Sequence, residues 1–258
     1  MILRRLTQNL REQNWTAISI EFVLLVLGVF LGIQVANWNE TRREHVLEAE
    51  YIARLQRDFD AIDARLTINL TRWEQTTVAA IRLLDDLDAF RQRGAWPRDK
   101  AGILRDLDAT MGSRIPAPRA GSYVELLSAG RLGLLRDSRM REALADYDAQ
   151  AGFTLKAYDV LVQRVDPHRP TLVRHLRYER TADITRLNPQ DILRNGGEGW
   201  GDVDLEQLAS DPHLETALNA FASASRNQVL NVRLQQEKAH AVIALLDPGF
   251  ATAGDKQP

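Results

Sequence analysis

Three short patterns are the places in this sequence where chemistry could lie. Glu237 and His240 form an E-x-x-H pair, which on a helix would put a carboxylate and an imidazole on one face, as in di-iron bundles. Such a centre needs a second E-x-x-H pair and two glutamates from other helices, and the sequence contains no second pair. We therefore expect Glu237 and His240 to be surface residues that meet by chance.

The other two patterns are also weak. His168 and His175 flank a proline break, but nothing acidic completes a metal site with them. The stretch 195–201 (N-G-G-E-G-W-G) lacks the preceding strand, the lysine and the hydroxyl of a phosphate-binding loop, so we expect a flexible connection. The absence of cysteine excludes thiolate metal centres and thiol nucleophiles. The sequence therefore predicts a non-enzymatic protein with no catalytic residue, no cofactor and no metal.

Composition argues against a nucleic-acid partner. The formal net charge is −2 and the isoelectric point is near 6.2, whereas nucleic-acid-binding domains carry a basic excess. Nearly all basic residues are arginines, which we attribute to a GC-rich bacterial genome rather than to phosphate binding. With 45% hydrophobic and 26% charged residues, the chain can bury an ordinary globular core.

One segment near the N-terminus has the composition of a membrane span. Phe22–Asn39 carries no charge, and with the apolar residues before it the hydrophobic stretch approaches the roughly 20 residues that cross a bilayer. Trp15 and Trp38 bracket this stretch, where membrane-interface aromatic residues lie. Gln34 stands two places before Ala36, which does not suit signal-peptide cleavage. We expect an uncleaved transmembrane helix over 17–38.

The orientation of this span follows from the residues around it. Residues 1–16 read as a short basic amphipathic tail, and the arginine counts on the two sides of the span are nearly tied. Long domains cross a membrane largely regardless of charge, and a short basic tail usually starts a signal anchor. We expect the bacterial cytoplasmic membrane, with the soluble part on its outer, periplasmic side.

The span also carries a possible contact face. Gly28 and Gly32 form a G-x-x-x-G pair, which lets two helix backbones approach closely, and Glu21 lies on the same side of the helix. This face would bind a second copy or another membrane protein. In the alternative interpretation, Glu21 is hydrated at the interface and the glycines are incidental. The predicted membrane-interface residues are Trp15, Gln34, Asn37, Trp38 and Asn39.

This segment resembles the N-terminal signature of a widespread bacterial family of single-pass membrane proteins, a domain of unknown function. The signature has an acidic residue before the span, then G-x-x-x-[GA]-x-Q-[IV]-x-N-W-N-E. The matching residues are Glu21, Gly28, Gly32, Gln34, Asn37, Trp38, Asn39 and Glu40. A second similar block runs from Tyr123 to Tyr147. The resemblance implies a membrane helix and a helical remainder, and it implies no activity.

Beyond the span the pattern stays helical. Apolar residues recur at spacings of three and four from Ile52 to Leu87, and no glycine or proline interrupts the chain between Gly32 and Gly94. This seam could pair with a second copy or form one face of an intrachain bundle. Phe59, Trp73 and Asn69 within it suit a bundle better than a two-stranded coiled coil. We expect a long juxtamembrane helix over 39–93.

The remainder of the bundle is expected over 94–248. Glycines and prolines delimit a helix over 98–110, Ser122 and Glu125 suggest a capping box, and a second seam with Leu155 on it runs from Asp137 to Val165. Asn188-Pro189 and Asp211-Pro212 suggest two further helix starts, the last helix running toward Leu246. Residues 249–258 are too polar to pack and are expected to form a disordered tail. The predicted class is all-α.

Two groups of side chains in the bundle have a structural interpretation. The acidic run Asp85, Asp86 and Asp88 is expected to cover a solvated helix face. The aromatic residues Trp73, Tyr123, Tyr147 and Tyr158 lie on apolar faces and are expected in the core. The function that remains is a membrane-tethered interaction or structural module. The alternative is a sensor-like ligand-binding bundle that signals through a membrane partner.

Overall fold

The structure is a computed structural model that describes residues 15–112, 115–178 and 200–247, and for 15–19 and 21 the backbone alone. Several predictions lie wholly or partly outside these residues: the amphipathic character of 1–14, the helix start at Asn188-Pro189, the connection over 195–199 and the tail 249–258. The chain divides into two units, Met1–Tyr51 and Ile52–Pro258.

The fold is all-α, as the sequence predicted. The helices are α2 (Trp15–Arg93), α3 (Lys100–Met111), α4 (Gly121–Ser128), α5 (Ser138–Val165), α6 (Arg169–Val173), α8 (Leu205–Ser210) and α9 (Leu214–Leu246). Short 3-10 turns lie at Leu132–Leu134 and Asp166–His168. The strands β1 (Leu176–Tyr178) and β2 (Trp200–Val203) pair antiparallel, with Leu176 opposite Val203. The expected connection over 195–201 is thus wrong at Trp200 and Gly201, which belong to β2.

In the first unit, the beginning of α2 is apolar on all sides. The large hydrophobic side chains from Phe22 to Val35 are all exposed, and a Cβ added at Gly28 or Gly32 would meet no atom of the described residues within 4 Å. A soluble helix keeps its apolar residues on a buried stripe, which this stretch does not do. By its length and composition this helix can cross a membrane. Among the described residues it is the one helix that meets this criterion.

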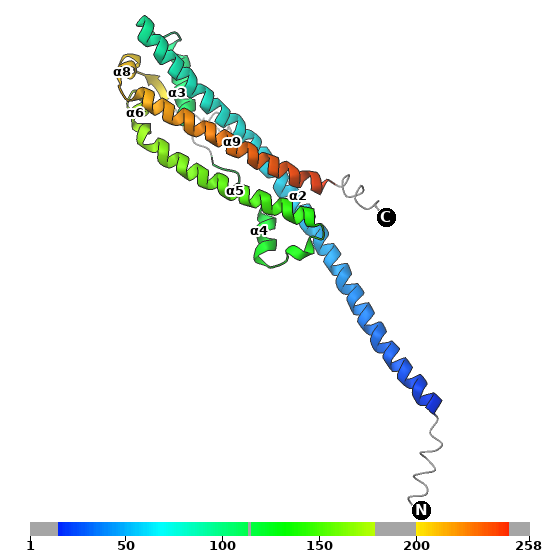
Figure 1. Ribbon diagram of the computed structural model, residues 1–258. Helices are drawn as coiled ribbons and strands as arrows, with labels where there is room; N and C mark the ends of the chain where they lie inside the picture. Colours follow the sequence, from blue (N-terminus) through cyan, green and yellow to red (C-terminus); the bar gives the residue numbers. More distant parts are fainter. Residues whose placement is uncertain (1–14, 113–114, 179–199, 248–258) are drawn as a thin grey trace, which may run out of the picture. The chain divides into compact units, whose positions relative to one another are not determined.

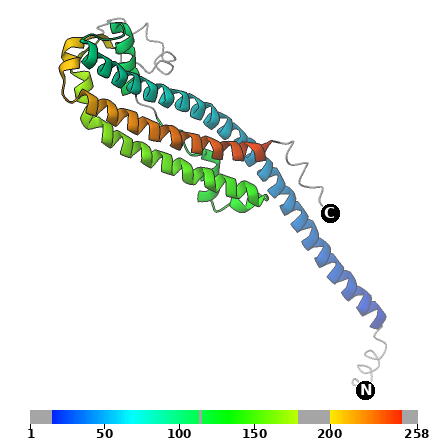
Figure 2. The ribbon, with the colours of Figure 1, turned by 45° about the horizontal axis from the view of Figure 1, so that its top comes forward.

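In the second unit, the remainder of α2 packs beside α5 and α9 (Figures 1 and 2). The predicted seam of α2 is buried within the chain: Leu55, Phe59 and Leu66 are fully covered. Hydrogen bonds tie α2 to α9, including Thr77 with Ser225 at 3.0 Å and Arg233 to Glu74 at 2.6 Å. The seam therefore forms the face of an intrachain bundle, which was the favoured interpretation.

An aromatic pair lies at the centre of this bundle. The rings of Phe59 and Tyr147 meet edge to face with centroids 4.9 Å apart. The Tyr147 hydroxyl donates to the carbonyl of Pro118 at 2.9 Å and accepts from Gln235 at 3.1 Å. Burial raises the pKa of Tyr147 to about 12, so the phenol stays neutral and keeps its proton for Pro118. Trp73 and Tyr123 are also buried and Tyr158 is half-buried, as their apolar faces predicted.

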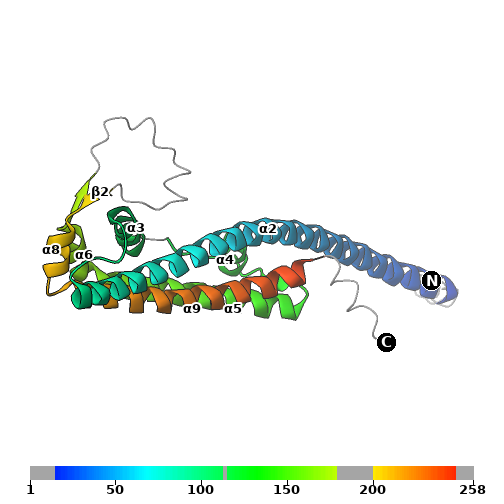
Figure 3. The ribbon, with the colours of Figure 1, turned by 90° about the horizontal axis from the view of Figure 1, so that it is seen from above.

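A second part of the core lies at the far end of α2. There α3, α6, β2, α8 and the start of α9 gather (Figure 3), burying Leu87, Leu107 and Leu218 among other residues. Gly94 ends α2 with φ at +69°, a left-handed conformation that glycine adopts without strain. Asp99 then begins α3, its carboxylate accepting from the Gly102 N–H at 3.0 Å. The helix expected over 98–110 is thus confirmed, with bounds Lys100–Met111.

The predicted capping box of Ser122 and Glu125 is wrong. Helix α4 begins at Gly121, and the Ser122 N–H donates to the carboxylate of Asp58 on α2 at 2.8 Å. Glu125 instead forms an ion pair with Arg54. The first turn of α4 is therefore capped by a side chain from a distant part of the sequence, because that turn packs directly against α2.

The expectation of a solvated acidic face fails at Asp86. Asp85 and Asp88 are exposed, but Asp86 is only 6% exposed and accepts from the Nε of Arg98 at 2.8 Å. The same guanidinium bonds Asp106 on α3, with its Nη1 2.8 Å from Oδ2. The pKa of Arg98 is raised by its hydrogen bond to Asp86 and, against the effect of burial, by Asp106. One arginine thus holds two carboxylates of different helices.

Two further details differ from the sequence patterns. Leu155 is exposed, and its neighbour Thr154 is buried in its place, donating to the Gln150 carbonyl at 2.9 Å. Near the middle of α5 the buried face therefore includes residue 154 and not residue 155, which was the position predicted from the sequence. Helix α9 begins at Leu214 rather than directly at Pro212, and Asp211 accepts from the His213 N–H at 2.9 Å.

Candidate functional site

The E-x-x-H pair does not act as a unit. His240 Nε2 lies 2.8 Å from Oδ1 of Asp63 on α2, and Glu237 is exposed on α9. No group of three or more His, Cys, Asp or Glu side chains with the geometry of a metal site lies among the described residues. The contact of His240 therefore ties α9 to α2.

His175 has an acidic partner that the sequence did not reveal, although the two residues do not make up a metal site. Its Nε2 lies 2.8 Å from Oδ2 of Asp211, and both side chains are buried. Burial raises the pKa of Asp211, but the His175 hydrogen bond, the His213 N–H and the Arg174 charge together lower it below its usual value. This pair joins the start of β1 to the turn before α9, which is a structural role.

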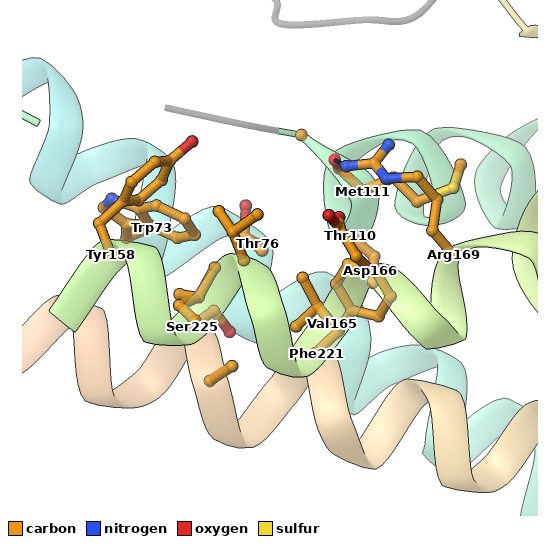
Figure 4. Close-up of a pocket in the computed structure, with 14 residues that line it drawn as sticks. Trp73, Thr76, Thr110, Met111, Tyr158, Val165, Asp166, Arg169, Phe221 and Ser225 are labelled. Atoms are coloured by element: carbon orange, nitrogen blue, oxygen red, sulfur yellow. Dashed lines mark hydrogen bonds between the residues drawn. The ribbon is translucent and has the colours of Figure 1, made fainter. Parts of the chain in front are cut away.

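A cavity opens where four parts of the bundle meet (Figure 4). It has a volume of about 120 Å³. Side chains of α2, of the end of α3, of α5 with the turn and the start of α6 after it, and of α9 form its walls. The lining residues are Trp73, Thr76, Thr110, Met111, Gly112, Tyr158, Leu161, Val162, Val165, Asp166, Arg169, Phe221, Ala224 and Ser225.

The two ends of this cavity differ in chemistry. Trp73 and Tyr158 lie together at one end, with ring centroids 6.4 Å apart, while Arg169 and Met111 lie at the other (Figure 4). The Nη2 of Arg169 donates to the Met111 carbonyl at 2.9 Å. Asp166, one helical turn before Arg169, is exposed. The cavity thus has an aromatic end and an end with both charges.

A groove runs between α5 and α9 and has a volume of about 350 Å³. Its residues are Phe153, Lys156, Ala157, Val160, Leu161, Arg164, Ala224, Asn227, Gln228 and Asn231. Phe153 is 58% exposed and Val160 is 59% exposed. At its floor, the amide nitrogen of Gln228 is buried and has no hydrogen-bond partner within the described structure. We call these residues the α5–α9 groove.

The residues predicted at the membrane stand on the first part of α2. Gln34, Asn37, Trp38 and Asn39 are exposed, and the Asn37 carbonyl accepts from the Thr41 hydroxyl at 3.0 Å. Gly28 and Gly32 lie one turn apart on an open helix surface. The side chains of Trp15 and Glu21 lie outside the described ones. The proposed contact face therefore stays a prediction.

Neither the cavity nor the α5–α9 groove was predicted from the sequence. Asp166 and Arg169 surround the proline break after α5, where opposite charges one turn apart were the available signal. Phe153, Val160 and Arg164 form a second stripe at helical spacing beside the seam of α5. This second apolar stripe can be recognised in the sequence. The spacing alone does not show which of the two neighbouring stripes of α5 is buried against other helices and which stays exposed.

Comparisons of the chain with family models, with curated proteins and with solved structures find no match.

Proposed function

We propose that this protein is a membrane-anchored, non-enzymatic interaction module whose α5–α9 groove binds an amphipathic helix of a partner protein. The observation that carries the proposal is the groove itself, a long apolar depression with exposed Phe153 and Val160 and a cationic rim. Amphipathic helices bind such grooves through apolar anchors one and two turns apart. The partner helix proposed here carries carboxylates beside its apolar stripe.

The apolar part of the groove fits a helix. Phe153 and Val160 are seven residues apart, so both lie on one face of α5 two turns from each other. Covering an aromatic or branched aliphatic side chain contributes about 1.5–3 kcal/mol. A helix lying between α5 and α9 would cover both side chains at once and complete a fourth position beside the three long helices.

The charge of the groove selects the partner. Lys156 and Arg164 lie along its α5 side, and neither forms an ion pair with a described carboxylate. The lining contains no acidic residue. If two copies met groove to groove, these cations would oppose one another, which disfavours self-association through this surface. Carboxylates on the partner helix would instead meet complementary charge.

Two synthetic peptides test this surface. Both carry the same apolar stripe, one flanked by glutamates and the other by lysines, and each is titrated against the full chain in phosphatidylcholine nanodiscs. We expect the acidic peptide to bind and Phe153→Ala to weaken it by about tenfold or more, since buried aromatic anchors dominate helix-in-groove affinity. The double variant Lys156→Glu/Arg164→Glu should reverse the preference between the peptides.

The matched control is Leu127→Ala, which removes an exposed apolar side chain on α4 outside the groove. It should leave the affinity for the acidic peptide unchanged. Equal binding of both peptides to the parent chain, or full binding to Phe153→Ala, would contradict the proposal.

The membrane half of the proposal concerns the first part of α2. We place residues 17–38 across the bacterial cytoplasmic membrane as an uncleaved anchor, with the bundle on the outer side. The run of exposed apolar side chains from Phe22 to Val35 supports the lipid bilayer as one partner. A second copy of the span, or the span of another membrane protein, is the partner proposed for the Glu21, Gly28 and Gly32 face.

Replacing both Gly28 and Gly32 by Ile should weaken helix–helix association in the membrane without preventing insertion. Small residues four apart let backbones approach, and no described residue of this chain lies within 4 Å of a Cβ added at either glycine. The measurement is cross-linking in membranes, normalised to the inserted protein, with Glu21→Gln testing the contribution of the charge. The control is the double variant Val23→Ile/Leu27→Ile, which introduces two isoleucines into the same helix and leaves both glycines in place. Undiminished cross-linking of the double glycine variant would show that the glycines face lipid.

A further inference from the structure

We propose that a depression between α2 and the start of α4 binds a phosphate monoester group, carried by a small soluble molecule or by a lipid headgroup. This goes beyond the interaction module, because the depression shares no residue with the α5–α9 groove. Its volume is about 300 Å³. Arg57, Ala61 and Arg65 line it on α2, and Arg119 and Gly121 line it at the entry to α4. We call this opening the α2–α4 depression.

Small side chains leave the space for a ligand. Ala61 lies four residues after Arg57 and four residues before Arg65, so the three are neighbours on the surface of one helix. Ala120 and Gly121 are equally small on the side of α4. The Cα atoms of Arg57 and Arg65 are about 12 Å apart along the helix axis, since each residue rises 1.5 Å. Two long arginine side chains can close this gap around one phosphate group.

Two of the arginines have charges that no described carboxylate balances. Arg57 and Arg65 are exposed, and neither forms an ion pair within the described part of the chain. Arg57 donates from Nε to the Ala53 carbonyl at 3.3 Å, which leaves both of its terminal nitrogens for a ligand. Arginine is common throughout this sequence. What distinguishes these two residues is their unpaired charge and the depression that they share.

The third arginine is held in position by a carboxylate. Nε and Nη2 of Arg119 bond the two carboxylate oxygens of Asp148 on α5, and the remaining N–H groups of Arg119 take no part in this pair. A guanidinium that is already fixed loses less conformational freedom when it binds an anion. Arg119 would therefore donate from a defined position, while Arg57 and Arg65 supply the uncompensated charge.

The acidic side chain that lines the depression is already engaged. Oδ2 of Asp58 accepts the Ser122 N–H at 2.8 Å, at the start of α4. The first turn of a helix carries a partial positive charge, which offsets that of the carboxylate. Asp58 therefore weakens the attraction of an anion to the depression and does not cancel it.

The charge and shape of the ligand group favour phosphate over carboxylate. A phosphate monoester carries about −1.5 to −2 charges at pH 7, which matches the two unpaired arginines. A carboxylate has a single charge and lies in one plane, so a single guanidinium satisfies it, as Arg119 does with Asp148. A phosphate group presents three oxygens in different directions and accepts from several guanidiniums at once.

Calorimetric titration of the full chain in phosphatidylcholine nanodiscs, at physiological salt, tests the soluble source of the phosphate. The probes are glycerol 3-phosphate, glycerate and glycerol, which share a carbon chain and differ in their charged group. We expect saturable binding of glycerol 3-phosphate, about tenfold or weaker binding of glycerate, and no binding of glycerol, because charge-assisted hydrogen bonds are lost in that order. Equal affinity for glycerol 3-phosphate and glycerate would overturn the assignment to phosphate.

Nanodiscs that contain phosphatidic acid test the lipid source, since this lipid carries the same phosphate monoester. Native mass spectrometry counts the phosphatidic acid that stays bound to the released protein. Binding of free glycerol 3-phosphate identifies a soluble ligand, and retained phosphatidic acid without binding of the free probe identifies a lipid headgroup. Binding of neither would overturn the proposal.

Variants connect the ligand to the depression. Ala61→Glu places a carboxylate four residues from both Arg57 and Arg65 and should abolish binding from either source. The double variant Arg57→Gln/Arg65→Gln should weaken binding by about a hundredfold. All three side chains are exposed, so circular dichroism should show an unchanged fold.

The matched control is Ala64→Glu, which adds the same charge at an exposed position of α2 outside the depression. It should bind the phosphate probe like the parent, within about twofold. A folded Ala61→Glu variant that binds like the parent, or an equal loss in Ala64→Glu, would overturn the site. Binding of the acidic peptide to the α5–α9 groove should be the same in all these variants, so the two proposals fail independently.

Discussion

Phe59→Ala should lower the free energy of unfolding by about 3–5 kcal/mol, the usual cost of emptying a fully buried phenylalanine position. Phe59 is completely covered and meets Tyr147 edge to face. The substitution removes the buried hydrocarbon, leaves a cavity between α2 and α5, and deprives Tyr147 of the ring that orients it. Urea unfolding of the full chain in mild detergent, followed by near-ultraviolet circular dichroism, measures the change.

Phe153→Ala is the matched control, since the same atoms are removed from a side chain that is 58% exposed. Its unfolding free energy should stay within about 0.5 kcal/mol of the parent. The two variants together separate a core phenylalanine from a groove phenylalanine. A loss below about 1 kcal/mol for Phe59→Ala would mean that α2 and α5 are not packed through this aromatic pair.

The helices could be predicted because their signals are local. The seam of α2 has helical spacing over many turns, and Gly94 and Pro167 stand where α2 and α5 end. The helix that can cross a membrane was recognisable because no polar face interrupts Phe22–Ile33. A periodic apolar seam, a helix-ending glycine or proline and an unbroken apolar run are each read within one short segment, so these features need no knowledge of the neighbouring elements.

The errors have the opposite origin, because each depends on a contact between residues distant in sequence. Asp58 caps α4, and Asp211 pairs with His175, through packing that no short pattern records. The strands β1 and β2 are too short to show alternation. The cavity combines side chains from several elements, so its existence follows from how α2, α5 and α9 pack and not from any motif.

Arg98→Met should also destabilise the bundle, by about 3 kcal/mol, because it leaves two buried carboxylates without their shared cation. The side chains of Asp86 and Asp106 are 9% and 12% exposed, and Arg98 bonds both. Methionine keeps much of the length of the side chain, so the loss reports the charge more than the packing. Arg82 lies 3.9 Å from Asp106 and offsets only part of the loss. Urea unfolding under the same conditions measures it.

Arg139→Met is the control for an arginine on the surface. Arg139 binds Asp137 at 2.9 Å, but the two side chains are 61% and 40% exposed, so water replaces the lost contact. The expected loss is far smaller than that for Arg98→Met, because solvent screens an ion pair at the surface. Adding Asp86→Asn to Arg98→Met should recover part of the stability, because one of the two uncompensated charges is then removed. Similar losses for Arg98→Met and Arg139→Met, with no recovery in the double variant, would show that water reaches Asp86 and Asp106 and that Arg98 does not hold α2 and α3 together.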